Sequence, residues 1–555
     1  MKYQHIFIFL FFFILLSCES IFHEPEISIA SIENREQLIE AAEGCWAQFI
    51  WALNFPDHTS YYYQNLKADD VTYRGTSYRS YYEKELECHP GYGSDLIFEY
   101  NKHSDYLYGS LYMVIASINN VLSQTPDIKP ADELTKQIVG EMLLLRAYCY
   151  FRLTRTYGQI LIVKNIEVNF NLSKPSLTQI YEFIEGDLKQ AISFMPLTAE
   201  LARNPGKRPG KGAAKALLAE VYLSWAGYPI KDDEKYANAA KEAEELMDSA
   251  DFYGIELLAD FAYLWDAEHT INRESLFTLY FPDLENVGSV DEINRIYMEE
   301  AKKHMFLTYF YVHPYYFDRG TNVAYYGNLE PTFYAAELNF FNHYPKGYRK
   351  EITFFTNIYV PARHWEEGLD TGYFHIDSVI SICDRAGYRK FYYEESLHAG
   401  GMDMSTLPDT SGFINIYNKP IGDNKIYLYR YAHTLLTYAE AKARSGQLDA
   451  LAYEAVNRIR RRAHNVDQFS PSVYDLTTGL SPVVFADSVV WERAWELAGE
   501  PEGRYFDLLR LEKLEELDQY RHPNENSPPW KTITHDEYFL SIPEQDISLN
   551  PALEE

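Results

Sequence analysis

The hydrophobic and polar positions of this chain alternate over long stretches with the period of an α-helix. Between residues 140 and 157 the apolar positions recur at the spacing i, i+3, i+4 and i+7 of one helical face. They are Leu144, Ala147, Tyr148 and Phe151. Gly158 follows and predicts the end of that helix. The same pattern predicts helices over the ranges 36–51, 106–122, 180–194, 213–226 and 235–247.

The clearest helical pattern lies near the C-terminus and predicts two neighbouring helices. The first stripe of small and apolar residues is Ala432, Leu435, Leu436, Ala439 and Ala443, and the second is Ala452, Ala455, Val456, Ile459 and Ala463. Gly446 ends the first helix and Asp449 is a good N-cap for the second. Because so short a connection forces the helices antiparallel, the pair resembles a tetratricopeptide unit, although the repeat consensus is degenerate.

Between these two helical regions the pattern changes. Proline, glycine and aromatic residues interrupt every periodicity from residue 251 to residue 425. Long irregular segments in a compact protein usually carry function. We therefore predict a mainly α fold, a tetratricopeptide-like helix-pair scaffold with a large irregular, loop-rich insertion that faces the ligand. The predicted parts are a signal peptide at 1–17, a tether at 18–30, an N-terminal helical region at 31–250, the insertion at 251–425 and a C-terminal helical region at 426–555.

The first residues have the organisation of a bacterial lipoprotein signal. Lys2 precedes an apolar run at 6–16, which is too short to cross a bilayer but has the length of a secretory signal core. Ser17 and Cys18 follow the run, so we expect cleavage before Cys18 and lipidation of its thiol. An ordinary secretory signal with an accidental cysteine is the alternative.

The charge composition of the chain limits the classes of molecule that it can bind. With 81 acidic and 50 basic residues, the net charge is −31, and such a surface repels nucleic acid and anionic headgroups. We therefore expect no nucleic-acid partner and attachment to the membrane through the N-terminal lipid. The remaining cysteines are widely separated and predict no disulfide framework; Cys149 falls in a helical core, and pairing is open for the others, Cys45, Cys88 and Cys383.

Known catalytic and metal-binding motifs are absent from the sequence. An acidic cluster occurs at Glu492, Glu496, Glu500, Glu502 and Asp507. It could be mistaken for the acid and base of a glycosidase. Because Arg493, Arg504 and Arg510 lie at or near helical reach, with Arg504–Asp507 and Asp507–Arg510 both spaced i,i+3, we predict a local ion-pair network instead. We expect no catalytic residue, no metal and no cofactor, and leave a structural calcium open.

The same acidic segment also forms part of a longer sequence pattern. It reads Glu492-Arg493-x-x-Glu496-Leu497, then Glu502-Gly503-Arg504-Tyr505-Phe506-Asp507-Leu508-Leu509-Arg510. This resembles the C-terminal signature of the SusD/RagB nutrient-binding lipoproteins of Bacteroidetes. Further similar segments follow the family order at 145–158, 187–191, 212–223, 438–460 and 542–551. Together with the lipoprotein signal they cover nearly the whole chain.

The resemblance implies a lipid-anchored protein on the outer face of the outer membrane. Such a protein binds a glycan or another nutrient and delivers it to a SusC-like TonB-dependent transporter. Tyrosine is abundant, at 48 residues, and its ring suits stacking on sugars. We predict ligand contacts in two stretches: Asp70, Arg74, Tyr78, Arg79, Tyr81, Tyr82 and Tyr92, and Tyr315, Tyr316, Tyr325 and Tyr326. Trp365 is a third candidate, and packing within the fold is the alternative for each residue.

Two other classes of function stay open from the sequence. A helical-repeat scaffold would hold a protein partner and would have no affinity for glycans. A surface glycoside hydrolase would need two carboxyl groups across a cleft.

Overall fold

The computed structural model describes most of the helical part of the chain. The described residues are 31–54, 68–70, 72–74, 97–125, 132–164, 172–197, 208–265, 269, 271–280, 333–336, 338–355, 357–360, 378–381, 386–388, 390, 413–415, 425–519, 534–535 and 538–554.

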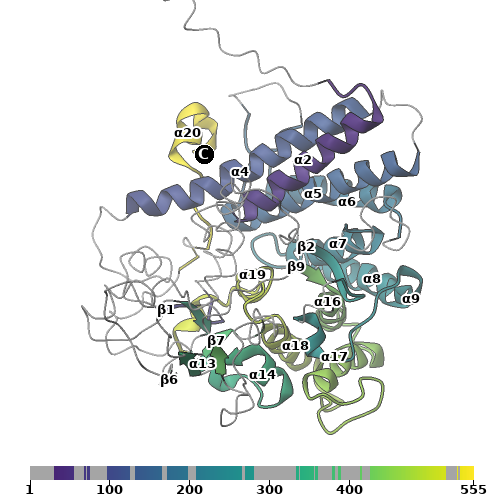
Figure 1. Ribbon diagram of the computed structural model, residues 1–555, viewed down its shortest axis with the longest axis vertical. Helices are drawn as coiled ribbons and strands as arrows, with labels where there is room; N and C mark the ends of the chain where they lie inside the picture. The colour runs from purple at the N-terminus through teal and green to yellow at the C-terminus, as the bar shows by residue number, and fades with distance from the viewer. Residues whose placement is uncertain are drawn as a thin grey trace, which may run out of the picture.

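Long helices follow one another through the first half of the described chain and pack as neighbours (Figure 1). They are α2 (Arg35–Asn54), α4 (Ile97–Gln124), α5 (Glu133–Tyr157), α6 (Leu177–Phe194), α7 (Lys211–Trp225) and α8 (Glu234–Asp248). Each of these helices packs on the next. In addition, α2 contacts α5, and α8 contacts a helix from the C-terminal part of the chain. This order is that of a stack of helix pairs.

Local sequence fixes several helix ends. Asp132 caps α5 by accepting a hydrogen bond from the Thr135 N–H at 2.9 Å. Gly158 ends the same helix with a positive φ of 74°, which glycine adopts without strain. Ser176 begins α6 with a capping box that it forms with Gln179. Gly140 lets α5 approach the end of α6, because a Cβ there would lie 2.3 Å from the Met195 Cγ.

The helical stack resumes after the insertion. The C-terminal helices are α16 (Tyr431–Arg444), α17 (Ala450–Ala463), α18 (Pro482–Glu496), α19 (Arg504–Arg510) and α20 (Glu544–Leu549). Helix α16 packs on α7, α8, α17 and α18 (Figure 1). The C-terminal helices therefore extend the helical stack directly after α8. Asp449 caps α17 as predicted, accepting from the Ala452 N–H at 2.8 Å. Both predicted alanine-rich stripes are buried.

A buried pair of strands joins the insertion to the helical body. Strand β2 (Ser275–Tyr280) pairs antiparallel with β9 (Lys425–Arg430), with Ser275 opposite Arg430 and Tyr280 opposite Lys425. Every residue of β9 is buried. The chain therefore leaves the body after β2 and returns to it through β9, directly into α16.

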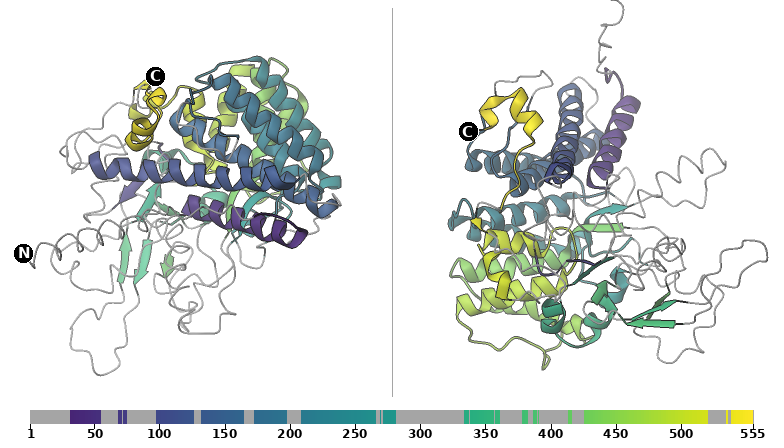
Figure 2. Two further views of the ribbon diagram at one scale, coloured as in Figure 1. Left: turned by 90° about the horizontal axis from the view of Figure 1, so that it is seen from above. Right: turned by 90° about the vertical axis from the view of Figure 1, so that its left-hand side faces the viewer.

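Short strands occur where the sequence predicted irregular structure. A four-stranded sheet has the order β1 (Thr72–Arg74), β3 (Phe333–Ala336), β7 (Ala386–Tyr388), β4 (Phe354–Phe355), and a three-stranded sheet has the order β6 (Ser378–Ser381), β5 (Asn357–Val360), β8 (Phe413–Asn415). Figure 2 shows these strands gathered to one side of the helical body. Short helical segments complete the fold: α9 (Ala250–Tyr253), η4 (Phe261–Leu264), α13 (Leu338–His343), α14 (Tyr348–Thr353), η8 (Glu515–Gln519) and η10 (Pro551–Leu553).

The prediction of a mainly α, tetratricopeptide-like scaffold is confirmed. All of the predicted helices are present; α4 begins nine residues and α5 seven residues before the predicted start, and the other bounds differ by a few residues. Cys149 lies in the core as predicted, and Cys45 is buried with it; both thiols are free. Cys88 and Cys383 lie outside the described residues, and the domain boundaries stay a prediction.

Candidate functional site

Most of the predicted ligand-contacting residues lie outside the part of the chain that the structure describes. These are Tyr78, Arg79, Tyr81, Tyr82, Tyr92, Tyr315, Tyr316, Tyr325, Tyr326 and Trp365, together with the predicted lipidation residue Cys18. Asp70 is described fully, and Arg74 is described as the last residue of β1. Their assignment to ligand binding therefore stays a prediction.

The structure does show where the two predicted stretches join the fold. Strand β1 ends at Arg74 and β3 begins at Phe333, and these two residues are directly opposite in an antiparallel pair. Cα atoms of such a pair lie about 5 Å apart. Residue 75 begins the stretch that leads to Tyr92, and residue 332 ends the stretch that contains Tyr326. The residues that precede the first stretch and follow the second therefore lie side by side, although they are 259 positions apart in the sequence.

Two aspartates directly before β1 tie this strand to the C-terminal helices. The Asp69 carboxylate accepts two hydrogen bonds from Arg504, at 2.8 Å and 3.1 Å. The Asp70 carboxylate accepts one from the Gly499 N–H at 2.9 Å. The strand that carries the first predicted stretch is thus held on the helical body by buried polar bonds.

Asp70 is buried beside the C-terminal helices. Its side chain is only 1% exposed, and burial raises its pKa to about 7, against the lowering effect of the Gly499 N–H. This burial favours the alternative of packing within the fold, and a ligand contact of Asp70 stays a prediction. Asp70 attaches the segment before β1 to the C-terminal part of the helical body, because its carboxylate accepts the hydrogen bond from the Gly499 N–H.

Beyond this anchor, a set of fully buried charges connects the insertion to the helical body. We call it the central network: Glu274, Arg349, Lys390, Arg430, Arg462, Glu492, Glu496 and Glu500. Arg430 lies at its centre, at the end of β9, and donates to Glu274 at 2.8 Å, to Glu496 at 2.6 Å and to Glu500 at 2.9 and 3.0 Å. Lys390 of the insertion donates to Glu500 at 2.8 Å. Each carboxylate is therefore compensated, as buried charges must be.

A second buried group surrounds Glu502. Its carboxylate accepts from the Tyr148 hydroxyl at 2.6 Å and from Arg152 at 3.2 Å, and it also pairs with Arg155. Burial by itself would raise the pKa of Glu502, but the two arginines of α5 lower it to about 2. Glu502 consequently attaches the segment before α19 to α5, most of whose residues are buried.

The prediction of an ion-pair network is confirmed, but the predicted partners were only partly right. Asp507 pairs with Arg510 at 2.7 Å, as the i,i+3 spacing indicated. Arg504 pairs with Asp69 instead of Asp507, because its guanidinium points toward β1 and lies 4.5 Å from the centre of the Trp491 ring. The acids Glu496, Glu500 and Glu502 take partners from distant parts of the chain: Arg349, Lys390, Arg430, Arg462, Arg152 and Arg155.

Sequence reasoning missed these arginines, although one signal was available. Arg152 and Arg155 interrupt an otherwise apolar and aromatic stretch of α5, and Arg430 ends a strand whose every residue is buried. A cation within an apolar face has to find a buried anion, so such positions identify candidate partners.

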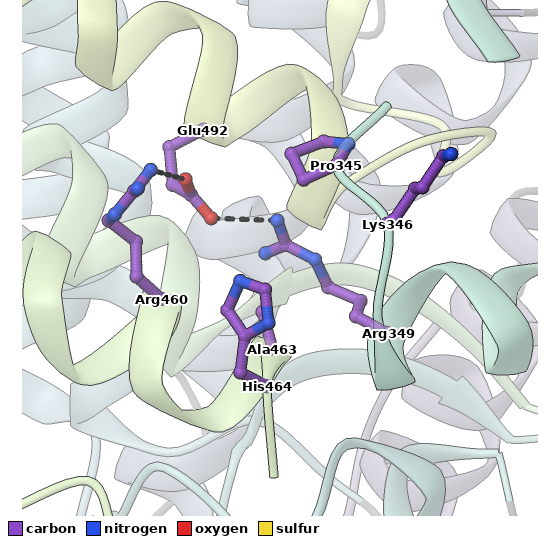
Figure 3. Close-up of a pocket in the computed structure, with 7 residues that line it drawn as sticks. All are labelled: Pro345, Lys346, Arg349, Arg460, Ala463, His464 and Glu492. Carbon is purple, nitrogen blue, oxygen red and sulfur yellow. Dashed lines mark hydrogen bonds and ion pairs between the residues drawn. The ribbon is translucent and has the colours of Figure 1, made fainter. Parts of the chain in front are cut away.

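A small cavity marks the edge of the central network (Figure 3). Glu492 lies between Arg349, at 2.7 Å, and Arg460, at 3.0 Å. The His464 ring points toward the same place and stacks on Tyr474 at 3.7 Å between ring centres. The cavity measures about 20 Å³, close to the smallest volume that admits a water molecule, about 10–15 Å³. Since Glu492 already pairs with both arginines and a sugar ring cannot enter, we assign this cavity to the structure of the α14–α17–α18 junction.

These acids are also poorly suited to glycoside hydrolysis. Burial alone would raise the pKa of Glu496 and Glu500, but the surrounding cations lower the first and hold the second at about 2. A glycosidase needs one carboxyl group that keeps its proton near neutral pH. Both glutamates are instead ionised and covered by arginine or lysine.

Two further features of the described residues concern ligands and membranes. They contain no group of three or more histidine, cysteine, aspartate or glutamate side chains arranged to hold a metal ion. Among the same residues, no helix has both the length and the apolar character needed to cross a bilayer.

Comparison with known proteins agrees with this architecture. Residues 34–223 match a family model described as SusD-like, "starch-binding associating with outer membrane", and residues 404–555 match the model of the SusD family. The chain belongs to the SusD/RagB family. This SusD-like chain is 25% identical over 462 residues to SusD-like protein P2 of Formosa agariphila, covering 80% of this chain and 78% of that protein. It is 23% identical over 486 residues to a SusD-like protein of Bacteroides ovatus, covering 81% and 79%.

Solved structures share the fold of this SusD-like protein. A SusD homologue from Bacteroides thetaiotaomicron superposes with a TM-score of 0.63 at 20% identity, covering 94% of this chain and 97% of that chain. Surface glycan-binding protein A from the same species, solved with laminarihexaose, gives a TM-score of 0.64 at 17% identity, covering 94% and 98%. The family is associated with the outer membrane and the cell surface, and glycan binding is its described property.

Proposed function

We propose that this protein captures an oligosaccharide at the cell surface through the stretches that follow β1 and precede β3, and delivers it to a SusC-like TonB-dependent transporter. The pairing of Arg74 with Phe333 is the observation that carries the proposal, because it brings together the two residues at which the tyrosine-rich segments join the described fold. The buried anchors of Asp69 and Asp70 give that point a rigid base.

The chemistry of these segments suits neutral sugars. A sugar ring has an apolar face that stacks on an aromatic ring and hydroxyl groups that bond to aspartate, arginine or tyrosine hydroxyls. The stretch from 74 to 92 contains both kinds of residue, with Arg74, Arg79 and several tyrosines. Binding of this kind needs no group that changes its protonation, which fits acids that are held in ion pairs.

We further propose that Cys18 carries the lipid that attaches the protein to the outer membrane, with the ligand surface facing outward. Several acyl chains anchor a protein stably, whereas one binds marginally. With a net charge of −31, the protein itself contributes no attraction to anionic headgroups.

The first experiment measures glycan binding by calorimetry after an array has found a ligand, with laminarihexaose as the starting probe. Replacing Tyr315 and Tyr316 together by alanine is expected to weaken binding at least about tenfold, since each stacked ring contributes about 0.5–1.5 kcal/mol. The control is Phe252→Ala, which removes an aromatic ring that is 72% exposed on α9. Equal binding by all three proteins, or a lower melting temperature in the tyrosine variant, would contradict the assignment of these tyrosines.

The second experiment addresses delivery and anchoring. Purification of the lipidated protein from its own outer membrane should recover a TonB-dependent transporter, and Cys18→Ala should release the protein from the membrane fraction. Release of oligosaccharides from polysaccharide by the purified protein would favour the hydrolase alternative. Recovery of a partner without affinity for any glycan would favour the scaffold alternative.

A further inference from the structure

A second cavity, separate from the central network, lies between the last helices of the chain. It is formed by α18, α19 and the segment that leads into η8, and it measures about 100 Å³. That volume is several times the minimum of about 10–15 Å³ for one water molecule. Its floor is apolar and densely packed: Val490, Leu508 and Leu517 are 4%, 2% and 1% exposed.

One wall of the cavity is the indole of Trp491. The Arg504 guanidinium lies 4.5 Å from the centre of this ring, and Arg504 is itself fixed by two hydrogen bonds to Asp69. Trp495, one turn later on α18, stacks near it with 5.9 Å between ring centres. The indole is therefore held in one orientation, and a ligand that meets it does not have to order it first.

The rim of the cavity is polar and carries both signs of charge. Lys513 and Asp487 form a loose ion pair at 3.5 Å, with side chains that are 33% and 47% exposed. Glu516 adds a second carboxylate at the exposed edge. Since an exposed pair at this distance contributes little, both groups can turn toward a ligand at small cost.

We propose that this cavity is a second carbohydrate subsite, which takes the edge of one neutral sugar residue. The apolar part of the sugar would lie against the portion of the Trp491 indole that lines the cavity and is left uncovered by Arg504 and Trp495. Of two neighbouring hydroxyls, one would donate to the Asp487 carboxylate and the other would accept from the Lys513 ammonium. The proposal rests on the proposed function for the class of ligand, although the cavity shares no residue with the predicted tyrosine stretches.

Charge selects the kind of sugar. The lining has two carboxylates, Asp487 and Glu516, and two cations, Lys513 and Arg504, of which Arg504 is already paired with Asp69, and the whole protein has a net charge of −31. Uronic acids and sulfated sugars would be repelled at this site, so neutral hexoses are the expected ligands. The cavity at Arg349 and Arg460 offers no alternative, because its space admits only about one water.

The position of the cavity links it to the predicted binding surface. Arg504 lines the cavity and binds Asp69, which precedes β1 by three residues. A sugar at Trp491 therefore lies at the base of the strand from which the first tyrosine stretch departs. This subsite would hold a second part of a bound glycan, or a second chain, beside the main site.

The test follows the indole N–H signals of the eight tryptophans by NMR during titration with glucose, galactose, mannose and laminarihexaose. Trp491→Phe assigns the relevant signal and keeps an aromatic ring in place. The signal of Trp491 is expected to shift with at least one of these sugars. It should still shift in the Tyr315→Ala, Tyr316→Ala variant, in which the main site is lost.

The rim is tested by Asp487→Asn with Lys513→Gln, which alters two exposed side chains and leaves the floor intact. We expect the affinity of the sugar that moves the Trp491 signal to fall about tenfold, as for the loss of one hydrogen bond to a charged group. The matched control is Glu256→Gln with Arg273→Gln, a partly exposed ion pair at 2.8 Å in the segment between α9 and β2. It should leave the affinity within about twofold.

The outcomes separate this inference from the proposed function. If sugars bind and the Trp491 signal stays unchanged, the second subsite does not exist while the proposed function stands. If the Trp491 signal shifts but the tyrosine variant loses no binding, the subsite stands and the main site is elsewhere. A signal that moves only with a protein partner, or with no sugar at all, overturns the subsite.

Discussion

Two regions of the molecule are held together in different ways. Helices α16 and α17 meet through stripes of alanine, leucine and isoleucine that are at most 6% exposed, and only two residues of connection lie between Gly446 and Asp449. The segment from α18 to α19 meets α5, α7 and β9 through buried charges, whose partners lie up to 435 positions away.

The difference concerns what each kind of contact requires. Small apolar stripes need only the right period and a short turn, and they tolerate small shifts of one helix along another. A buried ion pair needs its own partner at hydrogen-bond distance, because an unpaired charge in the interior is costly. The charged region therefore fixes the register of distant segments, including the insertion that Arg349 and Lys390 attach.

The largest effect is expected from Arg430→Met. This change leaves Glu274, Glu496 and Glu500 without their shared partner, and the free energy of unfolding should fall by about 5 kcal/mol, the upper end for breaking a buried pair. Urea unfolding followed by circular dichroism measures it. The control is Arg273→Met, whose ion pair with Glu256 is about half exposed and should cost less than about 1 kcal/mol. Similar losses in both variants would mean that the central network does not fix the fold.

Glu502→Gln should cost on the order of 3 kcal/mol at neutral pH. Its pKa is about 2 in the folded protein against an ordinary value of 4.5 for a glutamate, so the folded state holds the ionised form more favourably. This stability is present above pH 4.5 and is lost as the pH falls toward 2. The difference between variant and wild type should shrink over that window in urea unfolding at successive pH values. A difference that stays constant would contradict the role of ionisation.

Asp70→Asn should give an effect of the opposite pH dependence. Burial raises the pKa of Asp70 from 3.8 to about 7, so its protonated form stabilises the fold at low pH, and that contribution is lost as the pH rises from 3.8 to about 7. Asparagine cannot ionise, and its amide oxygen can still accept from the Gly499 N–H. Relative to wild type, the variant should gain on the order of 4 kcal/mol between pH 4 and pH 8. A flat difference across this range would show that Asp70 is ionised throughout.

The smallest effect is expected at a helix end in the apolar part of the scaffold. Ser176→Ala removes the capping box of α6 and should lower the free energy of unfolding by about 1 kcal/mol, without pH dependence. Ser193→Ala, in the exposed last turn of the same helix, should change it by less than about 0.5 kcal/mol. Equal effects at both positions would show that the cap contributes nothing specific.

Helix positions could be predicted from the sequence because the information is local. The stripes of α16 and α17, the cap at Asp449 and the stop at Gly158 each depend on residues within one or two turns. The ion pairs could be predicted only where the partners were equally close, as for Asp507 and Arg510. Arg504 was assigned to Asp507, three residues away. Its actual partner, Asp69, carries the same charge but lies 435 positions away in the sequence, so no local pattern indicates it.

For the candidate site, the sequence determined which residue types are available: tyrosines in two stretches, an acidic C-terminal cluster and a net negative charge. Only the tertiary structure decided that Arg74 lies opposite Phe333, that Asp70 is buried, and that Trp491, Asp487 and Lys513 surround one cavity. The physical reason is that hydrophobic periodicity and capping act between neighbours along the chain. Strand pairing, burial and charge compensation instead depend on which distant segments the folded core brings into contact.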